Sequence, residues 1–227
     1  MHLPPFTLAS MAEHVPAYQP QRRVTICGHS FIRRLEDETY TNPRMNHAMN
    51  IAEADISWCH RGGMTWFSFE EAAEGKQAVI RSSPDLLYIE LGTNGLDSYM
   101  PPLDVAQKAK TVVNDLLETG IKRVIIGEVI PRSRSGRVPL SMFEENEYAY
   151  NKFMNDLLIH ESASRRTQVD ERFKNPTVWF WRHKGLRTPE NNVLKWDGIH
   201  LNEEYGLPKL YGSIRTAILA GLRHLPV

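Results

Sequence analysis

The stretch Val24-Thr25-Ile26-Cys27-Gly28-His29-Ser30 joins a short apolar run to a glycine turn and a serine. The run is rich in β-branched residues, which is typical of a buried strand, and the residues from Phe31 to Leu35 are compatible with a helix. The stretch therefore predicts a strand that leads directly into a helix, with Ser30 at the junction. A serine at that place is either a helix N-cap or a nucleophile whose backbone N–H lies among the unpaired donors of the helix N-terminus.

Short apolar segments alternate with segments of helical periodicity along the rest of the chain. The predicted strands are Val24–Cys27, Asp55–Trp58, Leu86–Leu91, Arg123–Val129 and Thr177–Trp181. The clearest predicted helices cover Leu103–Thr119, Glu144–His160 and a last segment, Leu207–Ile218. Short strands without polar alternation, separated by helices, predict a parallel sheet that is covered on both faces. We therefore expect an α/β fold, a three-layer α/β/α sandwich with a five-stranded parallel sheet of the flavodoxin-like type.

The composition is that of an ordinary globular protein and favours no charged partner. The 227 residues are 41% hydrophobic, and 27 Lys plus Arg balance 27 Asp plus Glu. This balance argues against a nucleic-acid partner, and no apolar run suits a signal peptide or a membrane span. We expect residues 1–21 to form a flexible, proline-containing arm and residues 22–227 to form one domain. The lack of a disulfide framework, with only Cys27 and Cys59, favours an intracellular, cytoplasmic protein.

Polar and glycine-rich segments follow the predicted strands, at the edge where a parallel sheet binds its ligands. They supply Gly62 and Gly63 after the second strand, Asn94 after the third, and Asp197 and His200 before the last helix. The three-residue step from Asp197 to His200 lets the carboxylate orient one imidazole nitrogen, which leaves the other free to face Ser30. The chain thus carries a serine, a base, an orienter for the base and donors for an oxyanion. These are the parts that acyl transfer to water needs.

In this order, the Gly-x-Ser, Gly, Gly-x-Asn and Asp-x-x-His blocks resemble the SGNH hydrolases, also called GDSL-type esterases and lipases. The resemblance runs from about Val24 to the last helix. It implies hydrolysis of small-molecule or lipid esters through an acyl-enzyme, without a metal or an organic cofactor. It also implies that Ser30 is the nucleophile, His200 the general base and Asp197 its orienter. The implied oxyanion hole consists of the Ser30 N–H, the N–H of Gly63, with Gly62 as the alternative, and the Asn94 side chain.

The chain departs from the family pattern at two supporting positions, where His29 and Gly95 stand in place of aspartates. These departures put the rigidity of the loops in question more than the chemistry. Gly28-His29-Ser30-Phe31, followed by Arg33-Arg34-Leu35, also resembles the SGNH domains of some animal retrotransposon open reading frames. That resemblance leaves a lipid or membrane-surface substrate open, although nothing in the composition indicates one.

A second hypothesis is a catalytically weak binding module for RNA or lipid on the same fold, since one fold supports unrelated functions. Its basis is the altered supporting residues and a loop with Arg132, Arg134 and Arg137 after the fourth strand. Without such a role, we interpret this loop as solvated.

Several histidines and aromatic residues near the strand ends can have an ordinary structural role in place of a functional one. His29, His60 and His183 lack metal-ligand spacing, and we interpret them as surface or supporting groups. Trp66, Phe67 and Trp196 line either an acyl pocket or the core.

Overall fold

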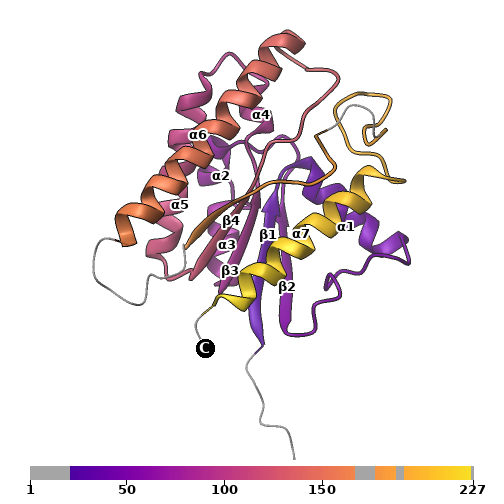
Figure 1. The fold of residues 1–227 in the computed structure, drawn as a ribbon. Helices are drawn as coiled ribbons and strands as arrows, with labels where there is room; N and C mark the ends of the chain where they lie inside the picture. Colours follow the sequence, from indigo (N-terminus) through magenta and orange to yellow (C-terminus); the bar gives the residue numbers. More distant parts are fainter. Residues whose placement is uncertain (1–20, 167–176, 188–191, 226–227) are drawn as a thin grey trace, which may run out of the picture.

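The computed structural model describes residues 21–166, 177–187 and 192–225, and it confirms the five-stranded parallel sheet (Figure 1). The strands are β1 (Arg22–Gly28), β2 (Ala54–His60), β3 (Leu86–Glu90), β4 (Arg123–Gly127) and β5 (Val178–Trp181). Neighbouring strands are parallel, and their order across the sheet is β2-β1-β3-β4-β5. Each strand lies within two residues of its predicted bounds. The predicted arm lies outside the described residues, except for Gln21.

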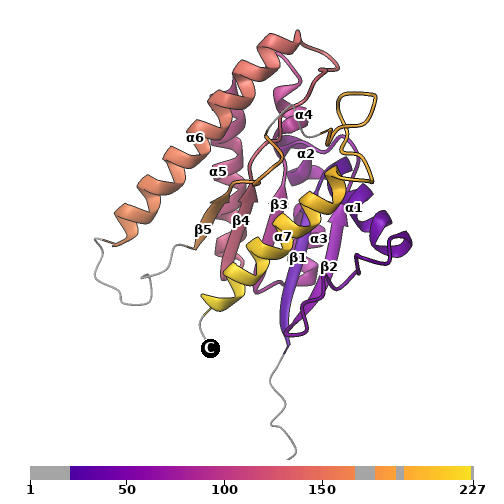
Figure 2. The same ribbon diagram turned by 45° about the vertical axis from the view of Figure 1, so that its right-hand side comes forward.

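Helices cover both faces of the sheet, so the predicted three-layer sandwich is confirmed. They are α1 (Ser30–Thr41), α2 (Trp66–Glu71), α3 (Lys76–Ser82), α4 (Thr93–Leu96), α5 (Pro102–Glu118), α6 (Leu140–Arg166) and α7 (Gly206–Arg223). The helices α1 and α7 pack on one face, whereas α2, α3, α5 and α6 share a core cluster on the other (Figure 2). The sequence analysis missed the short helices α2, α3 and α4, and α6 begins four residues earlier than expected.

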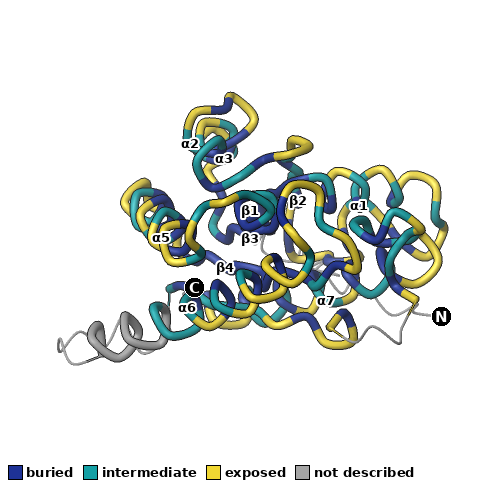
Figure 3. Tube along the Cα trace, turned by 90° about the horizontal axis from the view of Figure 1, so that it is seen from above, coloured by how far each residue is buried: buried dark blue, intermediate teal, exposed yellow. Residues whose placement is uncertain are grey.

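The strands form the centre of the core because both of their faces are covered. Every residue of β3 and β4 is buried, and Figure 3 shows these strands enclosed by helices. This burial explains why their sequences do not alternate between polar and apolar residues. None of the helices in the described ranges is long and apolar enough to cross a lipid bilayer.

The junction of β1 and α1 depends on a close approach of three backbone segments. A Cβ atom at Gly28 would lie 2.6 Å from the backbone oxygen of Glu90 and 2.6 Å from Cγ1 of Ile32, so only glycine fits. His29 is the N-cap of α1, and its Nδ1 accepts a hydrogen bond from the N–H of Phe31 at 3.3 Å. The interpretation of Ser30 as the helix cap is therefore wrong.

The sheet reverses its direction of winding between β1 and β3. The connection after β1 passes over one face through α1, whereas the connection after β3 passes over the other face through α5 (Figure 1). In open parallel sheets such a reversal leaves a crevice at the carboxyl ends of the strands, where ligands bind. The segments that carry Ser30 and Asn94 both begin at this reversal.

Candidate active site

The structure brings Ser30 together with two side chains that are far from it in the sequence. Ser30 Oγ, at the start of α1, lies 3.2 Å from His200 Nε2. His200 Nδ1 in turn lies 2.8 Å from Asp197 Oδ2. The His200 and Asp197 side chains are each 26% exposed, so the chain of contacts is open to solvent on one side. The geometry is that of a hydroxyl, a base and a carboxylate in proton-relay contact.

Asp197 organises its own loop as well as the imidazole. Its Oδ1 accepts hydrogen bonds from the backbone N–H groups of Ile199 and His200, both at 2.8 Å. Burial alone would raise the pKa of Asp197, but these N–H groups and the His200 ring lower it to about 2. The carboxylate is therefore ionised and can only accept, so His200 Nδ1 carries the proton and Nε2 is free to accept from Ser30.

The three predicted oxyanion donors come from the ends of β1, β2 and β3. The Ser30 N–H lies in the first turn of α1, where N–H groups have no partner within the helix. Asn94 Nδ2 donates to the backbone oxygen of Met64 at 3.1 Å, which joins α4 to the glycine segment. Met64 N–H closes a turn onto Arg61, and Gly63 has the positive φ of 73° that the third position of a type II turn requires. This turn accounts for Gly63 as glycine whether or not its N–H binds an oxyanion.

His29 is buried directly beside the candidate site, so it is a supporting group and not a surface one. Its ring is 0% exposed and packs 4.8 Å from the Phe31 ring. Burial first, then the charges of Arg132 and His200, lower the pKa of His29 to about 3. A neutral imidazole thus replaces the aspartate that the family pattern has before the serine.

The interpretation of the arginine loop as solvated is wrong for Arg132. Its side chain is 3% exposed and pairs with Asp97, with 3.4 Å between Nη1 and Oδ2. Arg134 and Arg137 are exposed, as expected. Sequence analysis missed Asp97, which lies three residues after Asn94 and 35 residues before its partner.

Of the three aromatic residues considered for an acyl pocket, two pack in the core and one lies on the surface. Trp66 is fully buried, and its Nε1 donates to the Tyr150 hydroxyl at 2.9 Å, so it belongs to the core. Phe67 packs against the same core cluster. Trp196 is 90% exposed, directly before Asp197.

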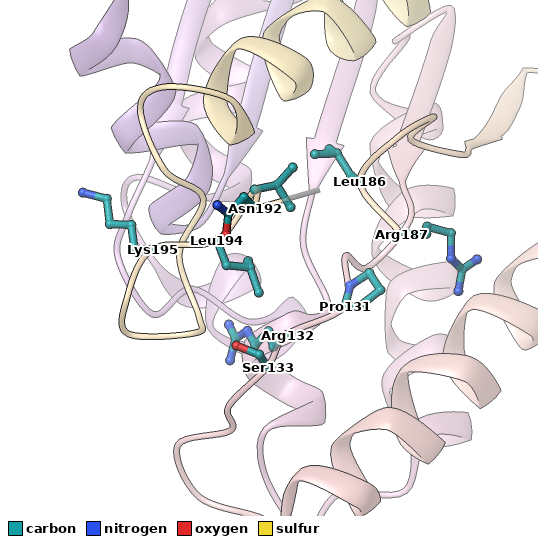
Figure 4. A pocket seen from close by; sticks show the side chains of 9 residues that line it. Pro131, Arg132, Ser133, Leu186, Arg187, Asn192, Leu194 and Lys195 are labelled. Atoms are coloured by element: carbon teal, nitrogen blue, oxygen red, sulfur yellow. The ribbon is translucent and has the colours of Figure 1, made fainter. Parts of the chain in front are cut away.

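A cavity of about 220 Å³ lies beside the loop that carries Asp197 and His200 (Figure 4). Pro131, Arg132, Ser133, Leu186, Arg187, Asn192, Val193, Leu194 and Lys195 line it. In Figure 4 the charged ends of Arg187 and Lys195 point away from the apolar side chains between them. Because none of the predicted site residues lines this cavity, we assign it no part in the chemistry.

A second serine–histidine–carboxylate chain lies inside the fold, and sequence analysis missed it. Ser213 Oγ, on α7, lies 2.9 Å from His183 Nδ1, and His183 Nε2 lies 3.2 Å from Glu90 Oε2. Trp181 Nε1 also donates to the Ser213 hydroxyl, at 3.0 Å. The His183 and Glu90 side chains are 0% and 2% exposed, so the imidazole and the carboxylate are sealed from solvent, whereas Ser213 is half-buried. Within the described ranges, no three His, Cys, Asp or Glu side chains are grouped so that they could hold a metal ion.

Solved structures of acylhydrolases are similar to this chain, whereas no family model and no curated sequence matches it. A putative acylhydrolase from Bacteroides fragilis aligns with a TM-score of 0.61 and 19% identity over 90% of both chains. A GDSL-like lipase from Bacteroides thetaiotaomicron aligns with a TM-score of 0.60 and 17% identity over 88% of this chain and 89% of the other. A carbohydrate acetylesterase from Sinorhizobium meliloti aligns with a TM-score of 0.59 and 17% identity over 88% of this chain and 99% of the other. At such identities the similarity shows the fold, which is that of the SGNH hydrolases.

Proposed function

We propose that the chain hydrolyses carboxylic esters, with acyl or acetyl groups, through a covalent acyl-enzyme at Ser30. The observation that carries the proposal is the hydrogen-bonded series Ser30–His200–Asp197 at the carboxyl edge of the sheet. The fold adds support, because the similar structures are described as acylhydrolases, a lipase and an acetylesterase.

In the acylation step, Ser30 Oγ attacks the ester carbonyl carbon while its proton passes to His200 Nε2. The oxyanion that forms receives hydrogen bonds from the Ser30 N–H, the Gly63 N–H and the Asn94 amide. His200 then gives its proton to the leaving alkoxide as the C–O bond breaks, and the acyl group stays on Ser30. Asp197 stabilises the imidazolium throughout and keeps the ring in the tautomer that can accept this proton.

In the deacylation step, water takes the place of the alcohol. His200 Nε2 accepts a proton from the water while its oxygen attacks the acyl carbon, and the proton then returns to Ser30 as the acid leaves. Neither step needs a metal ion or an organic cofactor. The substrate is a small-molecule or lipid ester, and the neighbours' names extend the choice to acetylated carbohydrates.

The test is covalent labelling with a fluorophosphonate probe, followed by mass spectrometry of the adduct. We expect labelling at Ser30, and loss of both labelling and p-nitrophenyl acetate hydrolysis in Ser30→Ala. Ser213→Ala is the matched control, because Ser213 also contacts a histidine, but that histidine is sealed from solvent. An adduct at another residue, or equal turnover in Ser30→Ala, would show that Ser30 is not the nucleophile.

The sequence-based alternative, a binding module for RNA or lipid, loses part of its basis because Arg132 is buried and paired. It stays a prediction for the exposed Arg134 and Arg137, and strong salt dependence of RNA binding would support it. The resemblance of residues 28–35 to retrotransposon SGNH domains also stays a prediction.

A further inference from the structure

Arg132 holds a buried positive charge at the edge of the candidate site. Apart from the Asp97 contact at 3.4 Å, its guanidinium lies over the Phe143 ring, 5.3 Å from the ring centre. Its Nε makes no hydrogen bond within the described residues. One long ion pair therefore compensates the charge only in part, and an incompletely paired buried charge acts on its neighbours through low-dielectric protein.

The charge of Arg132 acts on two groups that also interact with His200. Asp197, which is bonded to His200 Nδ1, is one of the two carboxylates that act on Arg132. His29 feels the charges of both Arg132 and His200. Burial lowers the pKa of Arg132 to about 10, so the guanidinium stays protonated at neutral pH.

The backbone next to Arg132 is fixed to the loop of the proposed base. Ser133 and Arg134 both donate their N–H groups to the backbone oxygen of Gly198, at 2.9 and 3.1 Å. The two segments are packed so closely that a Cβ atom at Gly198 would lie 2.5 Å from Ser133 Oγ. A movement of Arg132 would therefore be passed to the turn between Asp197 and His200.

On its other side, Arg132 is joined to the segment of the proposed oxyanion donor. Its partner Asp97 is the C-cap of α4, the helix that carries Asn94. The Asp97 carboxylate also accepts hydrogen bonds from the N–H groups of Gly136 and Arg137, each at 3.0 Å. One ion pair thus connects the loops that hold the donor and the base.

We propose that Arg132 is a positioning residue for the proposed hydrolysis: through Asp97 and through the backbone of Ser133 and Arg134 it holds the Asp197–His200 loop against α4. The inference rests on the proposed function, since it concerns His200 as the general base. A loop that is held in place keeps His200 within reach of Ser30, and this acts on the rate of the chemical steps more than on substrate binding.

The experiment separates the charge of Arg132 from its bulk. R132M removes the charge, R132K keeps it, and R137M is the matched control because it removes an exposed arginine from the same loop. Initial rates with p-nitrophenyl acetate give kcat and KM for each variant of the full chain, and urea unfolding shows whether each variant is folded. We expect kcat to fall by about tenfold in R132M with KM little changed, a smaller fall in R132K, and no change in R137M.

An unchanged kcat in R132M, an equal fall of kcat in R137M, or a loss in R132M that lies in KM alone overturns the inference. If the unchanged protein hydrolyses no ester, the proposed function fails and the inference fails with it, whereas an active protein whose R132M variant keeps its kcat rejects the positioning role alone. If R132M does not fold, D97N weakens the same contact from the side of α4 and should lower kcat with KM little changed; a kcat within threefold of that of the unchanged protein overturns the inference.

Discussion

Asp197→Asn should abolish the proposed base while keeping the loop around it. The Oδ1 position receives two backbone N–H groups, so an asparagine must place its carbonyl oxygen there and turn its NH₂ toward His200 Nδ1. Two donors cannot face each other, and the ring therefore moves its proton from Nδ1 to Nε2. His200 can then no longer accept the Ser30 proton, and we expect kcat to fall by about 10⁴, as for the same change in serine proteases.

The same variant has a calculable cost in stability. The Asp197 carboxyl has a pKa of about 2 in the folded chain against an ordinary 3.8. With allowance for its partial exposure, this difference corresponds to about 1–2 kcal/mol of folding free energy. Because the folded-state pKa is the lower one, this contribution is present above pH 3.8 and is lost as the pH falls toward 2. Asp197→Asn should therefore lower the stability at neutral pH and weaken its decline in acid.

Initial rates with p-nitrophenyl acetate and urea unfolding at several pH values measure both effects. Ser30→Ala gives the background rate, and Asp55→Asn is a control, because this exposed aspartate lies at the far end of β2. If Asp197→Asn kept kcat within tenfold of the unchanged protein, Asp197 would not be the orienter of the base.

Two further changes separate the proposed chemistry from the fold. Asn94→Ala should lower kcat by about 10²–10³ and change KM little, because the Asn94 amide is proposed to bind the oxyanion and not the ground-state carbonyl. If the same kinetic assay gave a loss of kcat below threefold, Asn94 would not be an oxyanion donor. Ser213→Ala should leave kcat/KM unchanged but lower the free energy of unfolding in urea by about 1–3 kcal/mol, since Trp181 and His183 lose a buried partner. Lost hydrolysis in a folded Ser213→Ala protein would contradict the separation of the two serine–histidine chains.

The sheet could be predicted from the sequence because most of its strands are short apolar runs that end at a turn; the edge strand β2 carries polar residues as well. The segments that form α2 and α3 show no recognisable pattern, since helices of one or two turns are too short for a clear helical periodicity. Serine favours the helix N-cap, so the sequence alone left Ser30 open as the cap of α1. Histidine is not a common cap, and only the structure shows that the His29 ring accepts from the Phe31 N–H.

The contact of Ser30 with His200 could be predicted because each residue adjoins a recognisable motif at a strand or helix end. The burial of Arg132 could not, because it depends on Asp97 from another loop and a single sequence contains no information on such pairs. Ser213, His183 and Glu90 lie on α7, after β5 and at the end of β3. No local spacing connects these three residues, so their contact follows only from the way the sheet is covered.

This molecule contains two serine–histidine–carboxylate chains, so the distances within a triad do not by themselves identify the nucleophile. Both hydroxyls lie within 3.2 Å of an imidazole nitrogen. Ser213, however, lies inside α7, where its N–H belongs to the helix, and its hydroxyl already accepts from Trp181. The backbone N–H of Ser213 is therefore not available to an oxyanion, and a substrate could not reach the sealed His183. Ser30 has the same contacts at a helix start on the open edge of the sheet, and this placement makes it the candidate nucleophile.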